Sequence, residues 1–483
     1  MEPASSRALG IAHVVANILH QSKDHQLPGR ARVAPLSRYA SVNKLWADEV
    51  TDMVWAELST LQPLQRVKAE RRQYYARKIR TLRITLDPHS PSATACLTDL
   101  ELPRLRDVEL MFHYDATLHH IPPVLTPKLR SVSVNCSPRC LSRATEYAIQ
   151  AIIVRCQQLE TFKYIGPSHH LVPERLLDLF MSQRSTLSDI RIHMADSLTQ
   201  NGVSEDLVTY LAERSVVRNI RAPQFRLHAP HSFAVADPFQ ALELLDIKAD
   251  YNSLHAISVF LPELRTLQIN LVRCETITSE PLAPILSRLA TSTKLETLKI
   301  ERRSQPRGGN LEIQTPVTLS GAAFAEFARN CRSLRKFCLE IQPGMVAEDF
   351  AVYHLRQAAS SLQCLQEVGL FLTPESSWLA AAAVSVFGES CPDLECCHIL
   401  GEFTVLDIDW ETEAIFPKLR RLSLNQVRGC QANCSLDILD SKLRKKFPCL
   451  ELLQVMKAFP GPLSAGASYL YDVPQAPRSD PSS

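Results

Sequence analysis

Leu295-Glu296-Thr297-Leu298-Lys299-Ile300 is one copy of a short phrase, Leu-x-x-Leu-x-Leu, that recurs along the chain with Ile, Val or Phe as replacements. Fourteen copies begin 22 to 39 residues apart, which is the spacing of a repeat array. The last two apolar positions lie two residues apart, so both side chains point to one face of an extended strand. One strand cannot bury that face alone, and neighbouring copies must stack. The copies begin at Ile79, Leu105, Leu129, Leu159, Leu187, Val217, Leu242, Leu264, Leu295, Leu334, Leu365, Leu394, Leu419 and Leu450.

Amphipathic helices are expected between many of these strands. One apolar stripe at helical spacing is Phe324, Phe327, Ala328 and Cys331, and another runs from Ala144 to Ile152. Strands joined by helical crossovers form a parallel sheet with right-handed connections. The sequence therefore predicts an α/β solenoid, a right-handed horseshoe with parallel strands on the concave side and helices outside.

Composition excludes two classes of partner. The chain has 53 Lys and Arg residues against 51 Asp and Glu, so no overall field attracts nucleic acid or an acidic membrane. The longest apolar stretch, 378–388, is far shorter than the roughly 20 residues that a membrane span requires. We expect neither a nucleic-acid partner nor a membrane.

The cysteine pattern favours buried, reduced thiols. Cys156, Cys331 and Cys391 each precede a repeat phrase by three residues, where a small apolar residue closes a helix. The close pairs 136/140 and 430/434 lack a second pair at zinc-finger spacing, so no metal site is predicted. Reduced thiols indicate an intracellular reducing compartment, which means the cytoplasm or the nucleus.

The chain before the array has a different pattern. Ile11, Val14, Val15 and Ile18 form an apolar stripe at helical spacing, and a second helical pattern covers 36–58. The second pattern contains the text Val42-Asn43-Lys44-Leu45-Trp46, followed by Val54-Trp55. Two of the four tryptophans in the chain therefore fall within this small block.

This block resembles the F-box proteins and, with the repeats behind it, the F-box/leucine-rich-repeat proteins, especially those of fungal type. The resemblance implies an all-helical F-box-like module at 8–58 that binds a Skp-type adaptor and, through it, a cullin. The chain would then be the substrate-recognition subunit of a ubiquitin ligase, with no cofactor. The residues expected to bind the adaptor are Ile11, Val14, Val15, Ile18, Leu36, Val42, Trp46 and Trp55.

A second interpretation of the same block remains open. Where the family usually opens with Leu-Pro and an acidic residue, this chain has Leu9-Gly10-Ile11-Ala12-His13. Terminal repeats of a solenoid also need a shielding cap, and a helical cap would explain the apolar positions. In that case the chain is a non-catalytic interaction scaffold with no ligase attached.

The expected domain layout follows from these patterns. After the module at 8–58, residues 59–78 form a connecting helix whose basic residues are solvated. The leucine-rich-repeat array occupies 79–457. Residues 458–483 are rich in Pro, Gly, Ser and Ala and are predicted to be a disordered tail.

Function is expected from binding rather than catalysis. No nucleophile elbow, Cys–His pair or paired carboxylates at a useful spacing occur, so no catalytic residue is proposed. Strand residues between the apolar positions face the concave wall, where they are mainly polar in the first repeats. From the eleventh repeat this lane becomes apolar. It is either a hot spot for an unidentified target protein or a surface that the end cap or the tail after Phe459 covers. The residues assigned to this partner site are Phe371, His398, Leu400, Leu452 and Met456.

Overall fold

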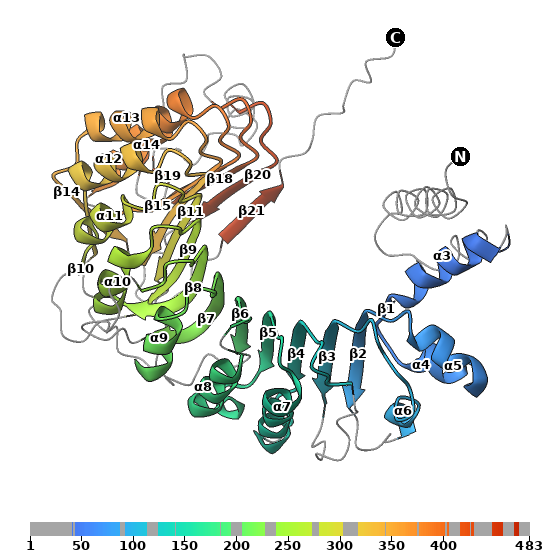
Figure 1. The fold of residues 1–483 in the computed structure, drawn as a ribbon. Helices are drawn as coiled ribbons and strands as arrows, with labels where there is room; N and C mark the ends of the chain where they lie inside the picture. The colour runs from blue at the N-terminus through green and yellow to red at the C-terminus, as the bar shows by residue number, and fades with distance from the viewer. Residues whose placement is uncertain are drawn as a thin grey trace, which may run out of the picture. The chain divides into compact units, whose positions relative to one another are not determined.

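Figure 1 shows a computed structural model of the chain. The structure describes residues 41, 44–86, 92–113, 124–140, 142–183, 185–194, 205–227, 238–272, 280–302, 317–342, 344–373, 376–400, 403–404, 416–425, 427–428, 447–456 and 468–472. The chain divides into two compact units, residues 1–199 and residues 200–483. This division falls inside the predicted repeat array.

In the first unit, the strands pair in chain order to form a parallel sheet. Helices lie along one side of the sheet, where α7 and α8 pack next to one another (Figure 1). The strands are β1 (Glu57–Leu58), β2 (Thr81–Leu86), β3 (Asp107–Phe112), β4 (Ser131–Cys136), β5 (Thr161–Gly166) and β6 (Asp189–Met194). The helices are α3 (Lys44–Trp55), α4 (Gln62–Arg66), α5 (Ala69–Ala76), α6 (Ser92–Ala95), α7 (Ser142–Arg155), η2 (Ser168–His170) and α8 (Pro173–Ser182).

The second unit continues the same strand-and-helix pattern. Its main sheet contains β7 (Asn219–Leu227), β8 (Leu244–Asp250), β9 (Thr266–Val272), β11 (Thr297–Arg302), β13 (Lys336–Ile341), β15 (Glu367–Phe371), β16 (Cys396–Leu400), β18 (Arg421–Asn425), β20 (Leu452–Met456) and β21 (Ser468–Asp472). The helices are α9 (Glu205–Ala212), α10 (Tyr251–Ile257), η3 (Ser258–Phe260), α11 (Ala283–Leu289), α12 (Gly321–Asn330), α13 (Val352–Ser361) and α14 (Ser377–Ser390).

Two small parallel sheets complete the second unit. The first consists of β10 (Glu280–Pro281), β12 (Val317–Ser320) and β14 (Met345–Glu348). The second consists of β17 (Phe403–Thr404) and β19 (Val427–Arg428). They pair the chain segments that lead from the main strands toward the helices.

Each of the fourteen repeat phrases contains a strand of the main sheets, which confirms the predicted α/β arrangement of parallel strands and outer helices. The register within each unit matches equivalent phrase positions. Leu298 pairs with Leu267 of the preceding repeat and with Phe337 of the following one. Backbone bonds link the turns before the strands in the same way; Arg335 N donates to Glu296 O at 2.8 Å.

Aromatic packing fixes the helices to the strands. Phe337 of β13 lies 5.1 Å from Phe324 and 5.9 Å from Phe327 of α12, measured between ring centroids. In the first unit, Phe162 of β5 meets Phe180 of α8 at 6.3 Å. Apolar side chains therefore occupy the helix-facing side of each strand, and the alternate residues form the opposite, open face of the sheet.

The cysteines that precede the repeat phrases have the structural role predicted for them. Cys156, Cys331 and Cys391 are buried and unpaired. The Cys391 thiol lies 3.5 Å from the carbonyl oxygen of Leu362 in the preceding repeat. Ser292 occupies the equivalent position of another repeat, and its hydroxyl group donates to the carbonyl oxygen of Leu261 at 2.6 Å. Burial raises the pKa of the Cys331 and Cys391 thiols to about 12, so both remain protonated.

Two segments differ from their sequence-based description. Residues 59–78 contain two short helices, α4 and α5, because Val67 and Lys68 are extended between them. Residues 468–472, which lie in the segment predicted to be disordered, form β21 antiparallel to β20. Among the described residues, no helix is both long enough and apolar enough to cross a bilayer.

Candidate functional site

Helix α3 carries the described part of the F-box-like text. Val50 is its buried centre, and Leu45, Trp46, Met53 and Val54 pack against it as partly buried side chains. Trp46 and Trp55 are thus the two predicted adaptor-binding residues whose positions can be described. The other six lie outside the described residues: Ile11, Val14, Val15, Ile18, Leu36 and Val42.

Trp55 contacts the segment that leads into the first repeat. Its indole stacks on Tyr75 of α5, with ring centroids 4.4 Å apart and an interplanar angle of 23°. Just after α3, β1 pairs with β2, placing Leu58 beside Leu82. The end of α3 is therefore built into the start of the sheet.

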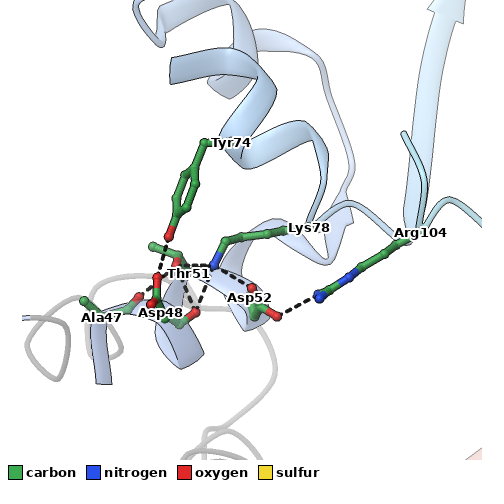
Figure 2. Close-up of polar contacts among 7 residues, drawn as sticks. All are labelled: Ala47, Asp48, Thr51, Asp52, Tyr74, Lys78 and Arg104. Atoms are coloured by element: carbon green, nitrogen blue, oxygen red, sulfur yellow. Dashed lines mark hydrogen bonds and ion pairs between the residues drawn. The ribbon is translucent and has the colours of Figure 1, made fainter. Parts of the chain in front are cut away.

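An ionic network completes the attachment of α3 (Figure 2). The ammonium group of Lys78 is 2.6 Å from Asp52 Oδ1 and donates to Thr51 Oγ1 at 2.9 Å. The other Asp52 oxygen accepts from Arg104 Nη1 at 2.9 Å. Tyr74 donates to Asp48 Oδ1 at 2.5 Å. We call the contacts of Asp52 with Lys78 and Arg104 the α3 lock.

Lys78 is the residue whose environment the sequence did not predict. It belongs to a basic segment that was expected to be solvated, yet only 8% of its surface is exposed. An isolated buried ammonium would be costly, and the carboxylate of Asp52 offsets that cost. The signal that could have identified this pairing is the placement of Asp48 and Asp52 one helical turn apart on α3.

The two ends of the α3 lock have shifted pKa values. Burial opposes ionisation of Asp52, but hydrogen bonds and charges from Lys78 and Arg104 hold its pKa below the ordinary 3.8. Burial likewise opposes the charge of Lys78, but the hydrogen bonds to Asp52 and Tyr74 raise its pKa above 10.5. Both groups are charged across the neutral range.

We expect α3 docking to weaken at both ends of the pH scale. The Asp52 contribution is complete above its ordinary pKa of 3.8 and is lost as the pH falls through its lower folded pKa. The Lys78 contribution is complete below 10.5 and is lost as the pH rises through its higher folded pKa. Hydrogen exchange of the α3 amides, corrected for intrinsic rates, measures the loss of docking at low pH and at high pH. If the loss at low pH were unchanged in Asp52→Asn, this assignment would be contradicted.

The open face of the second unit carries the predicted partner site. Phe371 of β15 pairs in register with Leu400 of β16, and His398 pairs with Ser423 of β18. Phe371, His398 and Leu452 are half-buried. Leu400 and Met456 lie on the strands β16 and β20, and their side chains are outside the described part. The register places Phe371, His398 and Leu400 on the neighbouring strands β15 and β16, and β18 separates them from Leu452 and Met456 on β20.

The surroundings of His398 disfavour its charged form. Burial, with the charges of Lys299 and Arg421, lowers the pKa of His398, although Glu367 acts in the opposite direction. The Nδ1 atom of His398 is 2.8 Å from Ser423 Oγ, so a neutral imidazole can accept the hydroxyl proton in a hydrogen bond. At neutral pH, His398 contributes a polar but uncharged surface beside Phe371.

The His398–Ser423 contact does not form a nucleophilic site. A serine nucleophile also needs backbone N–H groups directed at the developing oxyanion. The backbones of β16 and β18 are instead paired in the parallel ladder. Within the described ranges, no group of three His, Cys, Asp or Glu side chains has metal-binding geometry. What the open face offers is an extended surface for binding.

Comparison with known proteins finds no match by sequence and a weak structural similarity. No protein-family model matches the chain, and no curated protein matches its sequence. The chain is similar to a solved structure described as the crystal structure of the Rad7 and Elc1 complex in yeast. That match has a TM-score of 0.35 and 14% identity, and it covers 96% of this chain and 97% of the other. At this similarity it carries no functional argument.

Proposed function

We propose that the protein is the substrate-recognition subunit of a Skp-cullin-F-box type ubiquitin ligase. In this proposal, residues 8–58 bind a Skp-type adaptor, and the leucine-rich-repeat array binds a target protein. The observation that carries the proposal is the α3 lock, which joins helix α3, with Lys44, Leu45 and Trp46 of the F-box-like text, to Lys78 and Arg104.

A fixed α3 suits this role for a physical reason. A substrate receptor contributes proximity and orientation, and both are lost when the adaptor-binding part swings freely relative to the target-binding part. The lock involves residues of α3, the segment after α5 and the turn before β3, and Trp55 adds a stacked contact on α5. These contacts restrict both the tilt and the rotation of α3 on the first unit.

The target side of the proposal rests on the open face of the second unit. Phe371, His398 and Leu452 offer partly buried apolar or neutral surface, and Leu400 and Met456 belong to the same lane by register. The register places β18 between β16 and β20, so Arg421, Ser423 and Asn425 of β18 interrupt this lane, and Glu367 lies in it on β15. Protein-binding hot spots combine apolar anchors with polar neighbours.

The alternative function is a non-catalytic scaffold in which α3 is only a cap. A specific observation favours it: the side chains of Trp55 and Lys78 hold α3 against the segment that leads into the first repeat. Capping requires only that the first repeat be covered. The two proposals differ in whether residues 8–58 have an external partner.

Affinity purification of the full chain separates these proposals. We expect the adaptor and the cullin to co-purify with the native chain and to be lost in Val14→Asp with Ile18→Asp, because charged side chains would disrupt an apolar adaptor interface. The matched variant is Phe371→Ala, which should keep the adaptor and weaken target binding. Absence of both adaptor and cullin from the native preparation would refute the ligase proposal and leave the scaffold.

A further inference from the structure

Two columns of side chains run along the edge of each sheet where the strands begin. They are the residues immediately before and after the first apolar position of each repeat phrase. Backbone bonds set their register in the first unit: Arg106 N donates to Arg80 O at 2.8 Å, and Arg130 N donates to Arg106 O at 2.8 Å. Equivalent residues of successive repeats therefore lie about one strand spacing, or 4.8 Å, apart.

In the second unit, opposite charges alternate along these columns. Arg265 lies 3.0 Å from Glu296 of the next repeat, and Arg218 lies 3.5 Å from Glu243. In the other column, Lys418 lies 2.6 Å from Asp393. Neighbouring repeats are thus electrostatically matched at this edge, as cross-strand pairs generally are.

The first three repeats break this alternation. Their phrases begin Lys78-Ile79-Arg80, Arg104-Leu105-Arg106 and Lys128-Leu129-Arg130, so both columns are basic. Lys78 and Arg104 share the carboxylate of Asp52 in the α3 lock, which partly compensates their charges. The exposed cations that remain form what we call the basic ridge: Arg80, Arg106, Lys128 and Arg130.

The basic ridge has little internal compensation. Arg130 lies 3.3 Å from Glu160, and both side chains are about half exposed, so that pair is weak. Arg80, Arg106 and Lys128 have no side-chain partner among the described residues. The nearest carboxylate along the chain, Asp107, accepts a hydrogen bond from Thr81 instead. Stacked like charges of this kind destabilise the folded chain.

We propose that the basic ridge is a docking surface for an acidic segment of a partner protein. Each exposed guanidinium can hold one carboxylate through two parallel hydrogen bonds, and neighbouring guanidiniums match a run of Asp or Glu. The inference rests on the proposed function only in assuming that the array binds proteins. It adds a second binding surface, on the first unit, that recognises acidic side chains.

A nucleic acid fits the ridge less well. Non-specific binding to a phosphate backbone draws on about 6–10 phosphate contacts. The ridge spans three repeats and ends at Glu160, while Glu101 and Glu57 are exposed nearby in the same unit. A short acidic peptide needs only the length that the ridge provides. We therefore assign the surface to a protein partner.

The test uses the purified full chain and a fluorescein-labelled peptide of consecutive glutamates, with a glutamine peptide of equal length as the negative probe. We expect the glutamate peptide to bind and the affinity to fall about tenfold in Arg80→Gln with Arg106→Gln, since two charge-assisted contacts are removed. The matched control is Arg265→Gln, which changes an exposed arginine at the same repeat position that is already paired. This control should bind normally.

Three results would overturn the proposal. They are absence of glutamate-peptide binding, an equal loss of affinity in Arg265→Gln, and tighter binding of a single-stranded oligonucleotide that the same ridge variants weaken. The melting temperature of the double variant is a further readout. It should stay the same or rise because a like-charge pair is relieved, and a fall would assign the two arginines a structural role. Since no adaptor is present, these outcomes are independent of the ligase experiment.

Discussion

Replacement of Phe337 by Ala is expected to lower the free energy of unfolding of the second unit by about 3–5 kcal/mol. Phe337 is 0% exposed and lies between Phe324 and Phe327 of α12. Removing its ring leaves a cavity at the contact between helix and sheet, and packed neighbours close such cavities only in part. Denaturant titration of the full chain, monitored by circular dichroism, measures the change.

The matched control for Phe337 is Tyr353→Ala. Tyr353 lies on α13 of the same unit, but 64% of its surface is exposed. We expect this variant to stay within about 0.5 kcal/mol of the native chain. A Phe337 variant as stable as the Tyr353 variant would mean that α12 is not packed on the strands through this aromatic cluster.

The strand pattern could be predicted because its signal is local and repeated. Leu295, Leu298 and Ile300 specify a strand and its buried face without reference to the rest of the chain, and all three are 0% exposed. The division into two units could not be predicted, because the repeat phrase continues across it unchanged. The pairing of β21 with β20 was also missed, since the segment has the composition of a disordered tail.

The partner site was predicted from alternation alone, and alternation fixes only the face. It placed Phe371 and His398 on the open side of adjoining strands, where the register has them. It could not show that His398 would contact Ser423, because that contact depends on two strands 25 residues apart. Whether this lane binds a target is a prediction that the binding experiment tests.

The α3 lock illustrates what a single sequence does not reveal. Asp52 and Lys78 are 26 residues apart, and although the spacing of Asp48 and Asp52 marks an acidic face on α3, it does not identify Lys78 as the partner. The basic ridge, in contrast, was present in the sequence as three successive Lys/Arg-x-Arg triplets. The net charge of +2 does not reveal this local excess of basic residues. Charge must be compared between equivalent repeat positions for such a surface to be recognised.

Replacement of Asp52 by Ala is expected to cost about 2 kcal/mol in the docking of α3, because hydrogen bonds between charged groups contribute more than neutral ones. The variant leaves the 8%-exposed Lys78 without its carboxylate and frees Arg104. Hydrogen exchange of the α3 amides reports this local opening, while the amides of β4 and β5 should remain protected. Lys68→Met, which changes an exposed lysine next to α5, is the matched control and should have no effect.

A double-mutant cycle decides whether the α3 lock acts as a unit. If Asp52 and Lys78 stabilise α3 through each other, Asp52→Ala combined with Lys78→Met should cost less than the sum of the two single changes, since the double variant buries no unpaired charge. Strictly additive costs would mean that each residue holds α3 through separate contacts, such as Lys78 through Thr51 and Asp52 through Arg104. A coupled lock predicts that α3 is released in one step in both single variants.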